Sequence, residues 1–276
     1  MGRVLFVSAG PGAADLITLR GARALARADV VLFDALTDPA LREMAPEALW
    51  IDVGKRGFCH STKQTAINAA LVREAMAHEV VVRLKGGDAS VFGRLEEELQ
   101  ALAEAGIPFE IVPGVTAAIA AAAQTGRPLT RRGAGRSVAL TTAMTREGEL
   151  SLGPRGPSAD TEVFYMAGQQ LAALARRLLA AGWAADTPVS VVSRAGCPDA
   201  LASEHDVASL GAASMLHRGR PTVVVVGAGA APLAKAPALA GSEAGAIAEV
   251  GDYPTGSSRQ DPERPGPEFL AQTLND

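Results

Sequence analysis

Residues 83–94 read Arg83-Leu84-Lys85-Gly86-Gly87-Asp88-Ala89-Ser90-Val91-Phe92-Gly93-Arg94. The largely apolar run that leads into this stretch, from Glu79 to Leu84, predicts a buried strand. Two glycines end it, and glycine tolerates positive φ and lets a ligand approach the backbone. Three glutamates, 96 to 98, then occupy the first turns of a predicted helix. Because open α/β sheets bind ligands at the carboxyl ends of their strands, this junction predicts an α/β fold and a small-molecule site.

Composition limits the classes of protein. The chain has 276 residues, of which 48% are hydrophobic and 20% charged, which is typical of one or two globular domains. Its net charge of −4 and its 4% of aromatic residues argue against nucleic-acid binding. Cys59 and Cys197 form no metal pattern, and no membrane span or signal peptide is evident. We therefore expect a cytoplasmic protein without a metal site, a membrane contact or a nucleic-acid partner.

Strands and helices alternate along the chain, which predicts two α/β domains with largely parallel or mixed sheets. The first half predicts strands at 4–8, 30–33, 50–53, 80–84 and 110–112, and helices at 14–27, 39–44, 62–78, 94–105 and 116–125. The second half predicts strands at 138–142, 161–166, 189–193 and 222–227, and helices at 171–181 and 206–210. We place the N-terminal domain at 1–130, the C-terminal domain at 131–229 and a flexible tail at 230–276.

Polar or glycine-rich turns follow several predicted strands. The turn Gly10-Pro11-Gly12 resembles a dinucleotide fingerprint but lacks its third glycine, so NAD is not supported. Asp34 follows the second strand, as a helix cap or as a site residue. Lys55 lies in Gly54-Lys55-Arg56-Gly57 after the third strand, where the alternatives are solvated charge and an anion site.

Two further segments keep both a structural and a functional interpretation. The segment Pro113-Gly114-Val115-Thr116 predicts either close helix–sheet packing or a ligand donor at Thr116. An arginine cluster in residues 127–136 includes Arg132, and it is either a charged surface or a site for a polyanionic small molecule.

Taken in order, these motifs resemble the tetrapyrrole methylase family over roughly residues 3–228. The resemblance is carried by Gly10-Pro11-Gly12, Asp34-Ala35-Leu36, Val53-Gly54-Lys55-Arg56, His60-Ser61, Arg83 to Asp88, Phe92-Gly93-Arg94 with Glu97-Glu98, Pro113 to Thr116, Pro128-Leu129-Thr130 and Phe164-Tyr165-Met166. The Lys-Gly-Gly-Asp and Gly-Lys-Arg segments favour the members that act on uroporphyrinogen III over the later corrin-ring methylases.

The resemblance implies a homodimer of two-domain subunits with the active site in the cleft between the domains. It implies S-adenosyl-L-methionine as methyl donor, S-adenosyl-L-homocysteine as its product, and uroporphyrinogen III as acceptor. Methylation at C2 and C7 would give precorrin-2 by way of precorrin-1, in porphyrin, cobalamin or sirohaem biosynthesis. Two alternatives remain: another tetrapyrrole or corrinoid methylase of this fold, and a catalytically impaired tetrapyrrole-binding protein.

Residue roles also follow from the resemblance. Cofactor contacts fall on Pro11, Gly86, Gly87, Asp88, Val91, Thr116, Ala117, Met166 and Ala195. Catalytic positions fall on Arg94, Glu97 and Asp34, and substrate-binding positions on Lys55, Arg94 and Arg132. Arg94 and Glu97 are spaced i, i+3, so we expect a coupled pair in which Glu97 orients Arg94; the alternative is an exposed helix ion pair.

The sequence departs from the family pattern at several positions near the domain boundary. Ala13 replaces an aspartate, Ala89 replaces a proline, and residues 131–145 differ at several positions. These departures bear on the fine contacts with the substrate more than on cofactor binding.

Overall fold

A computed structural model of the protein describes residues 2–54, 64–142 and 157–233. The chain divides into two units at residue 236, of which residues 1–236 form the first. All the structure described below belongs to the first unit. Lys55 and most of the predicted tail lie outside the described residues.

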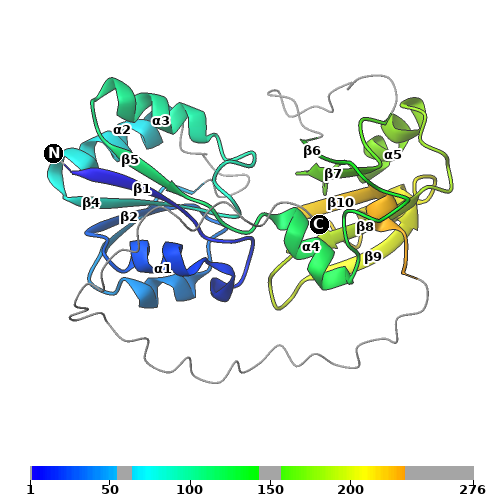
Figure 1. Ribbon diagram of the computed structural model, residues 1–276, viewed down its shortest axis with the longest axis horizontal. Coiled ribbons are helices and arrows are strands. Elements are labelled where there is room, and N and C mark those ends of the chain that lie inside the picture. The colour runs from blue at the N-terminus through cyan, green and yellow to red at the C-terminus, as the bar shows by residue number, and fades with distance from the viewer. Residues whose placement is uncertain (1, 55–63, 143–156, 234–276) are drawn as a thin grey trace, which may run out of the picture. The chain divides into compact units, whose positions relative to one another are not determined.

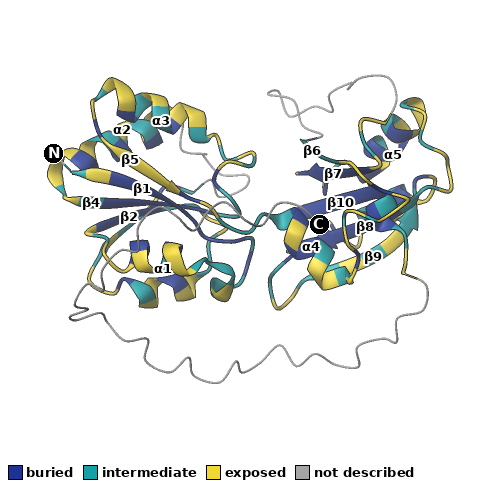
Figure 2. Ribbon diagram, viewed as in Figure 1, coloured by how far each residue is buried: buried dark blue, intermediate teal, exposed yellow. Residues whose placement is uncertain are grey.

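The first half forms a five-stranded sheet in the order β3-β2-β4-β1-β5, and every pair is parallel. Its strands are β1 (Arg3–Ser8), β2 (Val30–Phe33), β3 (Leu49–Asp52), β4 (Val80–Lys85) and β5 (Phe109–Val112). The central strands β1 and β4 are almost wholly buried (Figure 2). Their continuous apolar runs are typical of parallel strands covered on both faces.

Helices cover both faces of this sheet (Figure 1). On one face, α2 (Gln64–Ala77) and α3 (Leu95–Glu104) pack Ile67, Leu71 and Leu102 against Phe6 and Leu32. On the other face, α1 (Leu19–Leu25) and the 3₁₀ helix η2 (Pro39–Met44) pack Leu25 and Leu41 against strand residues such as Val31 and Leu84.

The second half forms a mixed five-stranded sheet in the order β6-β7-β10-β8-β9. Its strands are β6 (Val138–Thr142), β7 (Thr161–Tyr165), β8 (Pro188–Ser193), β9 (Leu201–Asp206) and β10 (Thr222–Gly227). Only the β6–β7 pair is parallel. One face packs against α5 (Leu171–Ala180) and the 3₁₀ helix η3 (Leu210–Ser214), and the other packs against α4 (Ala117–Thr125). A last 3₁₀ turn, η4 (Ala228–Ala230), follows β10.

The fold class is as predicted, with two differences in its elements. The helix expected at 14–27 is split into the 3₁₀ turn η1 (Ala14–Leu16) and α1, because Thr18 takes an extended conformation and its hydroxyl caps α1 by accepting from the Gly21 N–H. The strand β9 was not predicted, and the short helix expected at 206–210 is replaced by the end of β9, a turn and the start of η3. β9 is a polar, half-exposed edge strand, where composition signals strands poorly.

The contacts of α4 bear on the domain boundary. The predicted division at residue 130 assigned α4 to the N-terminal domain. In the structure the small residues Ala118, Ala120 and Ala121 of α4 pack against Val163, Val192 and Val225 of the second sheet. By these core contacts α4 is part of the second sheet's core. The division at residue 130 stays a prediction.

Candidate functional site

The strand order of the first sheet brings most of the predicted ligand residues to one edge of the sheet. The cofactor candidates Pro11, Gly86, Gly87, Asp88 and Thr116 follow β1, β4 and β5, which are neighbours. Asp34 follows β2, and Lys55, in the sequence after β3, lies outside the described residues. Because all five strands are parallel, their carboxyl ends share one edge, with these cofactor candidates at β4, β1 and β5 and Asp34 beside them at β2. Arg94, a substrate candidate, also follows β4.

The two glycine turns of this edge are joined to each other. The Gly87 N–H donates to the Gly10 carbonyl at 2.7 Å, and the Gly10 N–H donates to the Gly87 carbonyl at 3.2 Å. Both residues have positive φ, +80° and +70° for Gly10 and Gly87. A Cβ built at Gly87 would meet no atom within 4 Å, so there is open space beside the backbone for a ligand.

Asp88 ties this turn to the one after β5. One carboxylate oxygen accepts from the Gly114 N–H at 2.8 Å, and the other accepts from the Ser90 N–H at 2.9 Å and from the Ser90 hydroxyl. Partial burial raises the pKa of Asp88, but the hydrogen bonds from Ser90 and Gly114 outweigh this effect and hold the pKa below its ordinary value. Asp88 is therefore an ionised group that fixes the shape of both loops.

Ala89 contributes a backbone donor to the same turn. Its N–H donates to the Ser8 hydroxyl at 3.0 Å, and both residues are fully buried. A proline, which the family pattern has at this position, carries no N–H. The departure at Ala89 therefore comes with a hydrogen bond between the ends of β1 and β4.

Tyr165, at the end of β7, joins the first strand-end loops to the second sheet. Its hydroxyl lies 2.7 Å from the Thr116 hydroxyl and accepts from the Ala118 N–H at 3.2 Å, at the start of α4. Its ring lies 5.0 Å from that of Phe92, in the loop after β4. Three further cofactor candidates, Val91, Ala117 and Ala195, pack in the apolar cluster that contains Tyr165.

Strained backbone is concentrated in the strand-end loops. Among the residues that the structure describes, four non-glycine residues have positive φ, namely Phe92, Arg94, Met166 and Arg194, which follow β4, β7 or β8. Such conformations cost about 1–3 kcal/mol each and gather at functional sites. The cofactor candidate Met166 is half-exposed there.

Arg94 and Glu97 form the ion pair that their spacing predicts. The Arg94 Nε and Nη2 atoms donate to the two Glu97 oxygens, each at 2.6 Å, in a bidentate fork. Both side chains are close to half-exposed, at 44% and 48%. Arg94 also lines an open cavity of about 590 Å³ with Phe92 and Phe109. The guanidinium is thus oriented, and it remains accessible to a ligand.

Asp34 belongs to a cluster of buried charges beneath this edge. Arg83 donates to Asp34 at 2.6 Å and to Glu98 at 3.1 Å, and Lys85 donates to both Glu98 oxygens at 3.1 Å. Gln64 of α2 adds a hydrogen bond to Glu98 at 3.1 Å. Two cations and two carboxylates balance, and only Asp34 is partly exposed.

Burial lowers the pKa of Lys85, and the nearby Arg83 charge lowers it further, although Glu98 and Asp34 oppose both effects. For Arg83, burial acts to lower the pKa, but the charges of Asp34 and Glu98 raise it above its ordinary value. The cluster locks α3, which carries Glu97, onto β4.

The arginine cluster is divided between structural and exposed members. Arg127 is buried and binds Glu204 and the Ala230 carbonyl, and Arg131 binds the Ala231 carbonyl. These two arginines therefore hold the chain after β10, and the polyanion interpretation does not apply to them. Arg132 is exposed, in a turn closed by hydrogen bonds between the backbones of Arg131 and Gly135.

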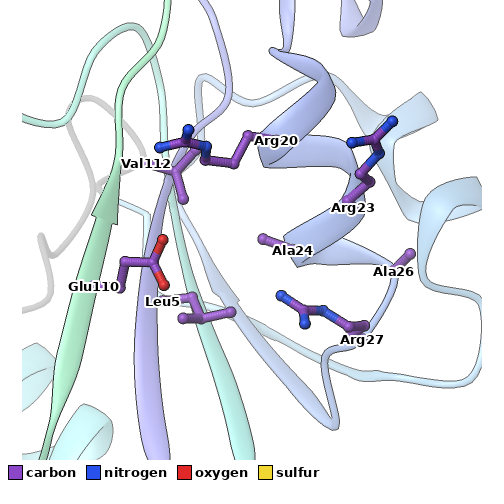
Figure 3. Close-up of a pocket in the computed structure, with 8 residues that line it drawn as sticks. All are labelled: Leu5, Arg20, Arg23, Ala24, Ala26, Arg27, Glu110 and Val112. Atoms are coloured by element: carbon purple, nitrogen blue, oxygen red, sulfur yellow. The ribbon is translucent and has the colours of Figure 1, made fainter. Parts of the chain in front are cut away.

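Two other cavities flank the first sheet. One, of about 310 Å³, lies between the turns after β1 and β2 and the loop after β8; it is lined by residues 11–13 and 35–39 with Arg194, Cys197, Pro198 and Pro221. The other, of about 520 Å³, lies between α1 and β5; Figure 3 shows Arg20, Arg23 and Arg27 around its apolar floor, with Glu110 opposite. None of the predicted site residues lines this second cavity.

Several polar residues at this edge were not assigned a role from the sequence. Arg83 and Lys85 lie two residues apart in an otherwise apolar strand. Two buried cations require a buried carboxylate nearby, so the sequence indicates that an acidic residue such as Glu98 must be their partner. Tyr165 gave no such signal, because its partners lie far away in the sequence. Arg194 gave none either, because its partner Asp199 follows five residues later in a loop without regular spacing. In the described ranges, no group of three His, Cys, Asp or Glu side chains could hold a metal ion. No helix among those residues is long and apolar enough to cross a membrane.

Comparison with known proteins gives consistent matches. Residues 3–210 match the family model of the Tetrapyrrole (Corrin/Porphyrin) Methylases. The chain is 46% identical over 195 residues to a uroporphyrinogen-III C-methyltransferase of Pseudomonas aeruginosa, covering 70% of this chain and 80% of that protein. It is 46% identical over 196 residues to siroheme synthase 1 of Klebsiella pneumoniae, of which it spans 42%. A structure of uroporphyrin-III C-methyltransferase from Thermus thermophilus, complexed with S-adenyl homocysteine, matches with a TM-score of 0.71 and 35% identity, covering 82% of this chain and 97% of that one.

Proposed function

The chain belongs to the tetrapyrrole methylase family, and from this premise we propose that it transfers methyl groups from S-adenosyl-L-methionine to carbon atoms of uroporphyrinogen III. The observation that carries the proposal is the joined pair of glycine turns at Gly10 and Gly87, with open space beside them, in a chain similar to an enzyme complexed with S-adenyl homocysteine. The relative from Pseudomonas aeruginosa supports uroporphyrinogen III as the acceptor.

The residues present fit the methyl donor. Gly86 and Gly87 expose backbone at the edge where β1 and β4 end, and Pro11 limits the turn opposite. Asp88 holds the loops after β4 and β5 in place, and Ala195 and Ala117 add small apolar surface beside them. The bound donor supplies a methyl group on a positively charged sulfur.

The acceptor side is assigned to Asp34, Lys55, Arg94 and Arg132. Uroporphyrinogen III carries eight carboxylates, and arginine forks bind carboxylates in bidentate pairs. Glu97 orients Arg94, which anchors the substrate; an arginine is too weak a general base to be assigned the proton.

Catalysis then rests on alignment. In the reaction a pyrrole carbon forms a bond to the methyl carbon, the methyl–sulfur bond breaks, S-adenosyl-L-homocysteine leaves, and the macrocycle loses a proton. Holding the two reactants in line is worth up to about 7–11 kcal/mol in favourable cases. Two successive transfers, at C2 and C7, would give precorrin-2. We also propose that the active protein is a homodimer in the cytoplasm.

The test is anaerobic incubation with uroporphyrinogen III and S-adenosyl-L-methionine, followed by absorbance and fluorescence of the dipyrrocorphin product. Product formation is expected. Turnover only with a precorrin substrate would instead favour a later corrinoid methylase. Binding of S-adenosyl-L-homocysteine without turnover of either substrate would favour the impaired tetrapyrrole-binding protein.

A further inference from the structure

Arg194 is held in an unusual backbone conformation at the end of β8. Its φ is +51°, in the left-handed region that few non-glycine residues adopt. Its N–H donates to the Pro221 carbonyl at 2.8 Å, and its carbonyl accepts from the Cys197 N–H at 2.9 Å. The position of the side chain is therefore set by the fold on both sides of the residue.

A carboxylate then orients the guanidinium. The Arg194 Nε atom donates to Asp199 Oδ1 at 2.8 Å, and Arg220 Nη2 holds Asp199 Oδ2 at 2.9 Å. Within the described part of the chain, the two terminal nitrogens of Arg194 have no hydrogen-bond acceptor. Those two nitrogens form the end of the fork that binds a carboxylate in a bidentate manner.

Arg194 lines the 310 Å³ cavity together with the turns after β1 and β2. The other charged residue in the lining is Asp38, whose oxygens accept from the Ala14 and Ala40 N–H groups at 3.0 Å each. Of the cofactor candidates only Pro11 lines this cavity, whereas its wall at residues 35–39 directly follows Asp34. The cavity thus reaches the loop after β2, beside Asp34.

We propose that Arg194 anchors a peripheral carboxylate of uroporphyrinogen III through its two terminal nitrogens, and that Asp199 is the positioning residue that aims them. This inference rests on the proposed function and adds a substrate contact from the second sheet. It assigns a purpose to the strained backbone of Arg194.

The first test replaces Arg194 by asparagine, a residue that tolerates the left-handed conformation. The KM for uroporphyrinogen III should rise at least about tenfold, as for the loss of a charged hydrogen-bonded pair. The affinity for S-adenosyl-L-homocysteine, measured by calorimetry, should stay within about twofold and shows that the variant is folded. Arg176→Gln on α5, which removes another exposed positive charge, is the matched control and should leave the KM unchanged.

Arg194→Lys, which keeps the charge but not the fork, should also raise the KM. An unchanged KM in Arg194→Asn would overturn the proposal, and so would a parallel loss of S-adenosyl-L-homocysteine affinity, since the anchor would then serve the donor. If the unsubstituted protein does not methylate uroporphyrinogen III, the proposed function itself fails. An active enzyme with an unaffected variant removes only the role of Arg194.

The second test separates orientation from charge. Asp199→Asn makes the site more positive, so a purely electrostatic role for Arg194 predicts a lower KM for an octacarboxylate. An orienting role predicts a higher KM with kcat nearly unchanged, because the guanidinium is no longer held by a carboxylate. A lower KM in Asp199→Asn would contradict the positioning role.

Discussion

At the scale of single residues, the Arg94–Glu97 pair was predictable and the surroundings of Asp88 were not. The i, i+3 spacing at the start of a predicted helix is enough to expect the ion pair, which the structure contains. Asp88 was assigned to the cofactor by resemblance, but its nearest partners are Ser90 and Gly114. A hydrogen bond between two loops 26 residues apart leaves no local pattern in the sequence.

Asp88→Ala tests whether the hydrogen bonds of Asp88 to Ser90 and Gly114 are needed for cofactor binding. Removing the carboxylate frees the loops after β4 and β5, and we expect S-adenosyl-L-homocysteine affinity to fall at least about tenfold. Calorimetry measures the affinity, and Asp15→Ala, which removes an exposed aspartate after β1, is the control. Unchanged binding in Asp88→Ala would remove Asp88 from the cofactor site.

The hydrogen bond from Ala89 to Ser8 gives a prediction about stability. Ala89→Pro removes the N–H that donates to the buried Ser8 hydroxyl, which destabilises the fold by about 1–3 kcal/mol. Proline also reduces the conformational freedom of the unfolded chain, which stabilises the fold by about 0.4–1 kcal/mol. We expect a net loss in the free energy of unfolding, measured in urea. The substitution should cost less in a Ser8→Ala background, and equal costs in both backgrounds would show that this hydrogen bond is not responsible.

At the scale of elements, the strands of the first sheet were predictable because their apolar runs are long and end at glycine or polar turns. The ends of the helices were harder to predict. The hydrophobic pattern continues through Thr18, and only the hydrogen bond of its side chain to the Gly21 N–H shows that α1 begins after it. The buried charges that join α3 to β4 were visible as residue types, but their pairing depends on which face of β4 the two helices cover.

Glu98→Gln tests this junction. Glu98 is fully buried and serves both Arg83 and Lys85, so its loss leaves two buried cations with only Asp34 as counter-charge. We expect a loss of about 3–5 kcal/mol in the free energy of unfolding. Glu96→Gln, on the exposed side of the same helix, should change it by less than about 0.5 kcal/mol. Similar effects of the two substitutions would argue against the cluster as a stabilising junction.

At the scale of the whole molecule, a chain of buried and half-buried hydrogen bonds joins β8, β9 and β10. His217 is fully buried; its Nδ1 lies 2.6 Å from the Ser193 hydroxyl, and its Nε2 lies 2.8 Å from the Ser203 hydroxyl. Ser203 also contacts His205, and Ser193 contacts Thr222. In the sequence these residues are scattered polar positions. They form a network only in the folded protein, where β10, β8 and β9 lie side by side.

This network makes the stability of the protein depend on pH. Burial lowers the pKa of His217, and the nearby His205 and Arg220 lower it further. In the unfolded chain the histidine binds a proton near its ordinary pKa of about 6.5, whereas the folded protein binds it only at lower pH. The free energy of unfolding should therefore be insensitive to this group above about pH 6.5 and fall below it, by at most about 1.4 kcal/mol per pH unit.

His217→Gln keeps a side chain that can both donate and accept hydrogen bonds but does not titrate. Its absolute stability is expected to differ from that of the original protein, so the informative quantity is the slope of the unfolding free energy against pH. Urea unfolding at intervals between pH 5 and pH 8 should show a shallower fall below about pH 6.5 in the variant, because one titrating group is gone. A variant that keeps the full slope would place the pH dependence elsewhere, in which case the Ser193–His217–Ser203 chain would only pack the second sheet together.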